Sequence, residues 1–431
     1  MSAENELKQK PVDVVAVAER ARALTPKMAA APRDRKDAVL RGMAARLKSR
    51  AEQIVSANTE DIADAQKSGV AENLLKRLRF DSAKLESRIR SLEKIAALPD
   101  PVGEVIRRDR LSNGLIAARV RVPLGVILMI YEARPHVSIN AGAFCMKSGN
   151  ACILRGGSEA RRCNALIGRL WGDSLEEAGL PRDAIQTISG THAEIRDLLQ
   201  LDRYIDLVIP RGGKGLIEAV ARESRIPVIK HYAGVCHVYV DDTADADMAV
   251  DIIVDSKCLM PSVCNALETV LVSRANREAL VKVVAALQRR GVLVKGCEST
   301  RAACPGVEPA GREDWTTEYL DMIVAVRVVE DIEAAIEHIN SYGSHHTDSI
   351  VTEDPLAAEA FQSRVDSAVV LANASTMFCD GESLGMGAEI GISTDKLHAR
   401  GPMGLNELTG YKFVITGKGQ VMGSPAGQID S

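Results

Sequence analysis

Aromatic residues and concentrated charge of one sign are scarce in this sequence. Aromatic side chains make up only 3% of its 431 residues, so the stacking platforms of single-strand nucleic-acid binders are not expected. The formal net charge is −4, and no long run of Lys and Arg occurs. Because nucleic acids and membrane surfaces attract concentrated positive charge, neither is expected as a partner.

Paired cysteine motifs and long apolar runs are also absent. None of the nine cysteines forms a C-x-x-C pair, which disfavours a zinc ribbon or a thioredoxin-type site. His345-His346 and Asp348 lack the regular spacing of a zinc site, so no metal is expected. No apolar stretch reaches the roughly 18 residues of a spanning helix, and residues 1–11 show no signal-peptide core. We therefore expect a cytoplasmic protein with reduced thiols.

The length and the first third of the chain predict several parts. A chain of 431 residues exceeds the usual size of one hydrophobic core, so at least two domains are expected. Residues 12–97 place apolar side chains at helical spacing, with Asn58 and Asp81 as expected helix caps. Residues 106–123 then predict a polar hairpin that turns at Asn113-Gly114. Such a hairpin is either a surface flap or an arm that reaches a second subunit.

From Pro123 onward, apolar runs of strand length alternate with helix-length amphipathic segments. This alternation predicts a doubly wound parallel sheet, which is a nucleotide-binding architecture, although no G-x-G-x-x-G or P-loop pattern is present. A second strand-and-helix series follows Cys264 and predicts a second α/β domain. The expected strands are 125–130, 151–154, 184–188, 205–209 and 226–229 in the first series, and 269–272, 322–329, 349–351 and 368–371 in the second.

Two glycine-rich turns follow expected strands of the first sheet. One reads Arg211-Gly212-Gly213-Lys214-Gly215 and the other reads Arg155-Gly156-Gly157-Ser158. Glycines at a helix start let backbone amides approach a phosphate, and ligands of doubly wound folds bind at the carboxyl ends of the strands. The alternative is a pair of tight turns with solvated cations and a cap from Ser158. Two such turns on neighbouring strands favour a nucleotide.

Cys264 lies in the segment Pro261-Ser262-Val263-Cys264-Asn265, at the expected junction of the two domains. A thiol after a proline turn, among small residues, can attack an acyl carbon. The alternative is a buried structural cysteine, which is the usual role of any one of nine cysteines. The position alone does not decide between them.

Five stretches, taken in this order, resemble the aldehyde dehydrogenase superfamily, and within it the gamma-glutamyl phosphate reductases. They are VPLGVILMIYEARPHV (122–137), SGNACILRGGSEA (148–160), VIPRGGKGLI (208–217), PSVCNALET (261–269) and LANASTMFCDGESLGMGAEIGISTDKLHARGPMGLNELTGYK (371–412). The resemblance implies a phosphorylating, NADP-dependent glutamate-5-semialdehyde dehydrogenase of proline biosynthesis. Its reaction is the NADPH-dependent reduction of L-glutamate 5-phosphate through a cysteine thioester.

The resemblance also assigns residues. It implies that Cys264 is the nucleophile, that the two glycine-rich turns flank NADPH, and that Glu318 holds the nicotinamide ribose. Arg134, Asn265 and Arg400 are candidate contacts for the substrate, although ion pairing is an alternative for both arginines. The cofactor domain is expected at 1–105 and 124–256 with a return at 399–410, the catalytic domain at 257–398, and an oligomerisation arm at 106–123 and 411–425. We further expect a homo-oligomer, such as a dimer, that is functionally coupled to glutamate 5-kinase.

Two departures from ordinary aldehyde dehydrogenases bear on mechanism. Those enzymes carry a glutamate base in an E-L-G-G-K segment, where this chain has His231-Tyr232-Ala233-Gly234-Val235-Cys236. Without that base, water is not activated against a thioester, as a phosphorylating enzyme requires. They also carry P-W-N-x-P, where this chain has Tyr131-Glu132-Ala133-Arg134-Pro135 without an asparagine, so the backbone amide of Cys264 is the remaining oxyanion candidate. The alternatives are a hydrolytic aldehyde dehydrogenase, a non-catalytic nucleotide sensor and a structural oligomer.

Overall fold

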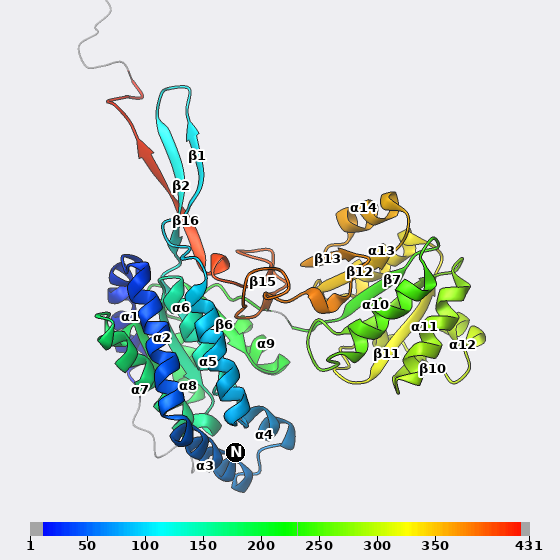
Figure 1. Cartoon of the computed structure of the whole chain (residues 1–431), viewed down its shortest axis with the longest axis horizontal. Helices are drawn as coiled ribbons and strands as arrows, with labels where there is room; N and C mark the ends of the chain where they lie inside the picture. The colour runs from blue at the N-terminus through cyan, green and yellow to red at the C-terminus, as the bar shows by residue number, and fades with distance from the viewer. Residues whose placement is uncertain (1–11, 231, 424–431) are drawn as a thin grey trace, which may run out of the picture. The chain divides into compact units, whose positions relative to one another are not determined.

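The computed structural model of the chain describes residues 12–230 and 232–423, which form two compact units. The first unit comprises the described residues up to Val228 together with those from Gly404, and the second runs from Ile229 to Met403 (Figure 1). Among the described residues, none of the helices combines the length and the apolarity that crossing a membrane requires.

The first unit begins with the expected helices. Asp81 caps one of them, since its carboxylate accepts a hydrogen bond from the backbone amide of Lys84 at 2.9 Å. The prediction that Asn58 is a cap was wrong, because Asn58 lies inside a helix. Its side chain instead pairs with the Leu78 carbonyl and the Phe80 amide, and so holds the segment that joins two later helices. The helices are α1 (Val14–Ala29), α2 (Arg33–Ser49), α3 (Ala51–Lys67), α4 (Glu72–Leu78) and α5 (Ser82–Ala97).

A four-stranded parallel sheet follows, in the order β5-β4-β3-β6. Every residue of β3 and β4 is buried, and the apolar face of α1 packs against both strands. The strand expected at 226–229 was wrong, because only a single bridge joins Val208 and Val228 there. The elements are β3 (Val126–Tyr131), α6 (Val137–Lys147), β4 (Ala151–Gly156), α7 (Arg161–Glu177), β5 (Ile185–Ile188), α8 (His192–Leu198), β6 (Leu207–Arg211) and α9 (Lys214–Glu223).

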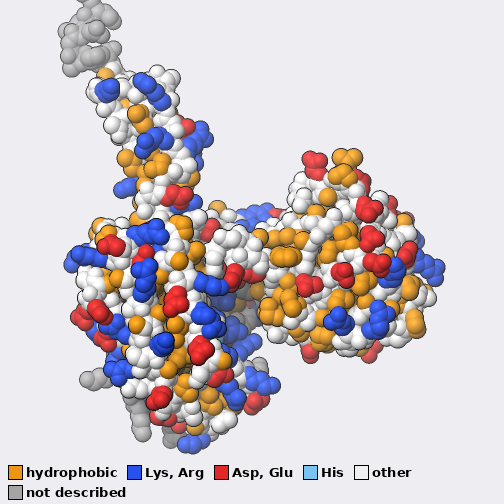
Figure 2. All heavy atoms as spheres, viewed as in Figure 1, with side chains coloured by type: hydrophobic (Ala, Val, Ile, Leu, Met, Phe, Trp, Pro, Cys, Tyr) orange, Lys and Arg blue, Asp and Glu red, His pale blue; other side chains and the backbone are white. Residues whose placement is uncertain are grey.

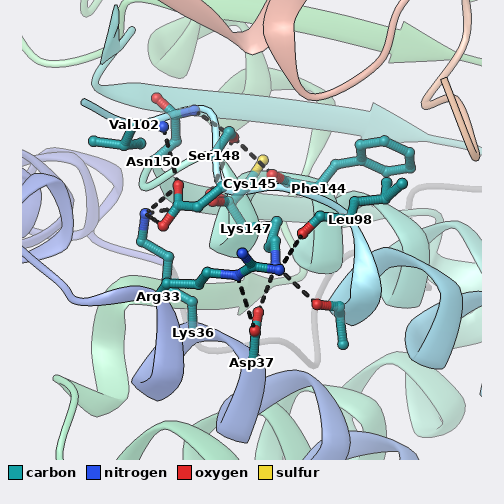
Figure 3. Close-up of polar contacts among 12 residues, drawn as sticks. Arg33, Lys36, Asp37, Leu98, Val102, Phe144, Cys145, Lys147, Ser148 and Asn150 are labelled. Carbon is teal, nitrogen blue, oxygen red and sulfur yellow. Dashed lines mark hydrogen bonds and ion pairs between the residues drawn. The ribbon is translucent and has the colours of Figure 1, made fainter. Parts of the chain in front are cut away.

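Two fully buried lysines join these helices (Figure 3). Lys147, the last residue of α6, pairs with Asp37 of α2 and donates to the Ala96 carbonyl of α5 at 2.9 Å. Lys36 of α2 donates to both carboxylate oxygens of Asp100, at 2.9 and 3.0 Å. Each buried ammonium therefore meets a carboxylate, and the pairs connect α2, α5 and α6.

The predicted hairpin is present as β1 (Val105–Arg110) and β2 (Ile116–Pro123), with β16 (Thr409–Thr416) antiparallel to β2. These three strands project from the helices of the first unit, and Figure 2 shows hydrophobic and cationic side chains along them. Tyr411, Phe413 and Ile415 of β16 are each more than half exposed. The strands form the geometry expected of an arm, whose residues 424 and 425 lie outside the described residues.

The second unit has a seven-stranded parallel sheet in the order β10-β9-β11-β8-β7-β12-β13. A short antiparallel pair, β14 (Ile392–Ser393) with β15 (Gly401–Pro402), follows it. The remaining elements are β7 (Cys236–Val240), α10 (Ala246–Cys258), β8 (Leu267–Ser273), α11 (Arg277–Arg289), β9 (Leu293–Gly296), α12 (Glu298–Ala303), β10 (Glu308–Pro309), β11 (Ile323–Val329), α13 (Ile332–Tyr342), β12 (Thr347–Val351), α14 (Pro355–Arg364) and β13 (Val369–Ala372).

The division between the units differs from the expected domain boundaries. The chain changes units after Val228 and after Met403, rather than at 256/257 and 398/399. The reason is β7, which was not predicted and which pairs in parallel with both β8 and β12. Residues 229–256 therefore belong to the second unit, whose sheet also positions Cys264.

Candidate active site

Cys264 lies in the turn between α10 and β8, and it is half-buried. The backbone of this turn rests on Gly234, where an added Cβ would lie only 1.8 Å from the Cys264 carbonyl oxygen. Only glycine allows this approach. The Cys236 thiol, at the start of β7, also donates to the Cys264 carbonyl at 3.3 Å. Gly234, which precedes β7, and Cys236, the first residue of β7, thus fix the backbone that carries the nucleophile candidate.

Asn265 holds the other side of the same turn. Its side-chain amide donates to the carbonyls of Met377 and Cys379, at 3.2 Å each, and the residue is buried. Both amide hydrogens are therefore used within the protein. The Asn265 side chain thus holds the turn that carries Cys264.

The cysteines around Cys264 are poor nucleophiles. Cys236 is buried, and this burial raises the pKa of its thiol well above the ordinary value. Burial likewise raises the pKa of Cys379 to about 12. Since the thiolate is the reactive form, both neighbours stay protonated near neutral pH. Cys264 is the more accessible of the three, which favours it as the site of covalent chemistry.

Glu318 lies beside the same glycine. Its carboxylate accepts a hydrogen bond from the Gly234 amide at 2.8 Å. The glycine that supports Cys264 therefore also orients Glu318, so the structure brings these two predicted residues to one place in the second unit.

A buried ion pair that the sequence analysis missed supports Glu318. Lys257, near the end of α10, pairs with Glu268 of β8 at 2.7 Å, and both side chains are fully buried. The other oxygen of Glu268 accepts from the Leu320 amide at 3.2 Å, where Leu320 has a positive φ of 54°. Burial raises the pKa of Glu268 to about 7 and lowers that of Lys257. The pair thus holds the turn that carries Glu318. In the sequence, a glutamate within the apolar strand at 267–273 could have indicated such a buried pair.

The Arg155–Ser158 turn lies at the carboxyl end of β4 in the first unit. Arg155 is buried and donates to the Gly190 carbonyl at 3.0 Å, so part of its guanidinium braces the neighbouring turn. Its Nε atom has no partner among the described residues. An added Cβ would lie 2.1 Å from Asn164 at Gly156, and 2.1 Å from Glu159 at Gly157. Ser158 is exposed and so can reach a ligand.

The Arg211–Gly215 turn follows β6 and begins α9, whose N-cap Gly213 supplies no side-chain hydrogen bond. The Gly213 amide donates to the Glu132 carboxylate at 2.9 Å, and the Glu132 amide donates to the Arg211 carbonyl at 3.1 Å. Lys214 is exposed. Because β3, β4 and β6 are parallel neighbours, their carboxyl ends bring both glycine-rich turns to one sheet edge.

The two candidate arginines differ in their partners. Arg400 of the second unit donates to the Asp366 carboxylate at 2.7 Å and to the Asp366 carbonyl at 3.0 Å. Arg400 therefore forms an ion pair, which was the alternative to a substrate contact for this residue. The side chain of Arg134, which follows β3, makes no hydrogen bond or ion pair within 12–230 and 232–423, and only its backbone carbonyl accepts one, from the Val137 amide at 2.9 Å.

Comparison with known proteins identifies the family. The model of the aldehyde dehydrogenase family matches residues 6–313. The crystal structure of a glyceraldehyde-3-phosphate dehydrogenase from Methanocaldococcus jannaschii, complexed with NADP, has the same fold at a TM-score of 0.65 and 15% identity. The chain therefore belongs to the aldehyde dehydrogenase family, an oxidoreductase family.

Within that family, the chain groups with the gamma-glutamyl phosphate reductases. It is 48% identical over 404 residues to the reductase of Parvibaculum lavamentivorans, covering 93% of this chain and 95% of that protein. The crystal structure of the Thermotoga maritima reductase superposes at a TM-score of 0.92 with 41% identity, covering 95% of this chain and 100% of that one. The resemblance predicted from the motifs is confirmed, as is the fold class.

Proposed function

We propose that the protein reduces L-glutamate 5-phosphate to L-glutamate 5-semialdehyde and phosphate, with NADPH as reductant and Cys264 as nucleophile. The observation that carries the proposal is the 48% identity to a gamma-glutamyl phosphate reductase over 93% of the chain. The reaction is the second step of proline biosynthesis from glutamate, and a cytoplasmic location suits it. The accessible Cys264 on its glycine-supported turn provides the required thiol.

The covalent steps follow from thiol chemistry. The Cys264 thiolate attacks the γ-carbonyl, and the tetrahedral intermediate expels phosphate to leave a thioester. When bound, NADPH supplies a hydride to the thioester carbon, which produces a thiohemiacetal. The C–S bond then breaks, which releases the aldehyde and regenerates the thiol. Since phosphate is a good leaving group, the first step depends on positioning more than on acid catalysis.

Water must not compete with phosphate for the thioester. Residues 231–236 contain no carboxylate at the position of the usual base, and Gly234 there packs on the Cys264 backbone. Glu318 is the acid beside this glycine, and it accepts the Gly234 amide hydrogen. We propose that Glu318 binds the nicotinamide ribose rather than activating water.

The residues of the first unit fit a dinucleotide phosphate. α9 has ten residues, and its amino end offers backbone amides next to Arg211, Gly212, Gly213 and Lys214. The exposed Ser158 and the partly unmatched Arg155, with Gly156 and Gly157, suit an adenosine ribose that carries a 2′-phosphate. These contacts are the basis for proposing NADPH over NADH.

We also propose that the arm joins subunits into a dimer or a dimer-based oligomer. β16 exposes Tyr411, Phe413 and Ile415 on an edge strand whose described pairing is with β2 alone. Open edges that carry apolar side chains pair readily with a second chain. Coupling to glutamate 5-kinase suits a labile acyl-phosphate substrate.

Replacing the thiol tests the chemistry. Cys264→Ser should lower turnover on the order of 10⁴-fold or more while the melting curve is retained. Wild-type enzyme given semialdehyde and NADP without phosphate should gain the mass of one glutamyl group, and the variant should not. Cys297→Ser is the matched control, because Cys297 is another half-buried thiol of the second unit that precedes α12. Retained turnover in Cys264→Ser would exclude the proposal.

A further inference from the structure

One group of basic side chains in the first unit lacks carboxylate partners among the described residues. Arg134 and His136 follow β3, and Arg88 lies on α5; all three are half-buried. The Arg88 side chain donates to the Ser87 hydroxyl at 2.9 Å and makes no other hydrogen bond or ion pair within the described part of the chain. The guanidinium groups of Arg211, at the end of β6, and of Arg134 make no hydrogen bond or ion pair there, although the backbone carbonyls of both residues accept hydrogen bonds. The group therefore differs from the paired lysines of the same unit.

His136 marks the centre of this group. Its ring packs against Phe80 with centroids 5.9 Å apart, and its Nδ1 atom is buried without a hydrogen-bond partner among the described residues. Burial, followed by the charges of Arg88, Lys84, Arg134 and Arg211, lowers the pKa of His136 to about 3. The imidazole is therefore neutral, and cations from three separate elements act on it together.

Within the residues that the structure describes, no carboxylate forms an ion pair with Arg88, Arg134 or Arg211. Burial, together with Arg211 and Arg77, lowers the pKa of Arg134, and Glu132 is the one group that opposes this shift. The Glu132 carboxylate already accepts the Gly213 amide hydrogen at 2.9 Å. Removing part of a cation's hydration without supplying an anion is unfavourable, so a bound anion would stabilise such a group.

We propose that Arg88, Arg134 and His136 form a subsite for an oxyanion of the substrate, with Arg211 at its edge. This inference rests on the proposed function, because L-glutamate 5-phosphate carries two oxyanionic groups, the α-carboxylate and the phosphate. Arginine suits either, since its planar fork donates two parallel hydrogen bonds to a carboxylate or a phosphate. The neutral His136 has a ring nitrogen left to pair with the same ligand.

The reverse reaction separates the two oxyanions, because semialdehyde and phosphate are then different substrates. We would measure KM for semialdehyde, phosphate and NADP in Arg88→Gln and Arg134→Gln. Each loss of a charge-assisted hydrogen bond should raise one KM by about 10- to 100-fold. A rise for semialdehyde identifies the α-carboxylate as the ligand, and a rise for phosphate identifies the phosphate. The inference is overturned if the KM values for semialdehyde and phosphate both stay unchanged, whether or not the KM for NADP rises.

Arg90→Gln is the matched control. Arg90 lies two residues further along α5, is exposed, and pairs with Glu86 at 3.9 Å. Its three KM values should match those of the wild type. A similar rise in Arg90→Gln would mean that general electrostatics, rather than a subsite, causes the effect, and the inference would fall.

A binding measurement keeps this inference separate from the proposed function. Melting curves of the full chain, with L-glutamate or inorganic phosphate added, need no turnover. Wild type should be stabilised by at least one of the two anions, and the Arg88→Gln/Arg134→Gln double variant by neither. If the wild type fails to turn over but shows this difference, the substrate assignment is wrong and the anion subsite stands. Equal anion responses in the two proteins would overturn the subsite.

Discussion

The first unit contains two sets of buried or half-buried cations, one with carboxylate partners and one without. Lys36 and Lys147 are fully buried, and each meets a carboxylate, Asp100 and Asp37 respectively. Arg88, on α5, and Arg134, directly after β3, are half-buried, and the side chain of neither meets one within the described residues. The two sets therefore differ in function: the lysines that form ion pairs join helices, whereas the arginines without a carboxylate partner are available to a ligand.

Replacing a member of each set should therefore change the free energy of unfolding in opposite directions. Removing one member of a matched pair leaves a buried charge alone, which is strongly destabilising. Removing an unmatched cation relieves a desolvation cost in the empty protein but removes a ligand contact. Stability measurements and kinetic measurements should thus respond to different residues.

The largest stability effect is expected for the matched set. Asp37→Ala leaves the Lys147 ammonium buried with the Ala96 carbonyl as its remaining contact, 2.9 Å away. We expect the free energy of unfolding to fall by about 3–5 kcal/mol in chemical denaturation. Replacing both partners, in Asp37→Leu/Lys147→Met, should recover most of this loss. If the single and the double variants are equally unstable, the pair itself does not stabilise the fold.

The buried Lys257–Glu268 pair of the second unit should make stability depend on pH. Burial raises the pKa of Glu268 from 4.5 to about 7, so the folded state keeps a proton that the unfolded state loses within this window. Stability should consequently fall as pH rises from about 4.5 to about 7, by up to ~3 kcal/mol. The Lys257→Met/Glu268→Gln variant should lack this slope. Parallel pH profiles of the two proteins, in denaturant titrations, would contradict the assignment.

A smaller effect of opposite sign is expected for the unmatched set. Arg88→Met/Arg134→Met removes two cations that have no counter-ion, so the ligand-free protein should gain about 1 kcal/mol in free energy of unfolding. Denaturant titration without phosphate or substrate measures this gain. A loss of several kcal/mol would show that both arginines are structural, and would remove the distinction on which the comparison depends.

The smallest effect is expected at a surface ion pair. Arg182 pairs with Asp173 and Glu176 at 2.8 and 2.6 Å, with 42% of its side chain exposed. Solvent and salt screen such contacts, so Arg182→Gln should leave the melting temperature unchanged within error. A clear decrease would mean that distance alone, rather than burial, decides which pairs matter in this protein.

Much of the fold was predictable because its elements carry local signals. The Asn113-Gly114 hairpin, the Asp81 cap and the buried strands β3 and β4 all appear where the sequence indicates. β7 was missed, and with it the boundary at Val228, because its pairing with β8 and β12 is a long-range property. The prediction of a strand at 226–229 was wrong because a local apolar run does not ensure pairing. Among the described residues, this segment forms only the single bridge between Val208 and Val228.

The sequence predicted the site residues that lie in recognisable motifs. It did not predict the roles that depend on hydrogen-bond or ion-pair partners. The sequence predicted Cys264 and Glu318, and the structure brings both to Gly234. It could not show that Asn265 uses its amide on two carbonyls, or that Asp366 holds Arg400. The partners lie 112 and 114 positions from Asn265 and 34 positions from Arg400, and no local pattern encodes contacts at such separations.

The most direct test of the account is the reverse reaction with and without inorganic phosphate. NADPH formation from L-glutamate 5-semialdehyde and NADP should require phosphate, since phosphate must attack the Cys264 thioester to release the product. Without phosphate, we expect at most one turnover per active site, with the glutamyl group retained on Cys264. Sustained turnover without phosphate would show that water resolves the thioester, and the enzyme would then be a hydrolytic aldehyde dehydrogenase.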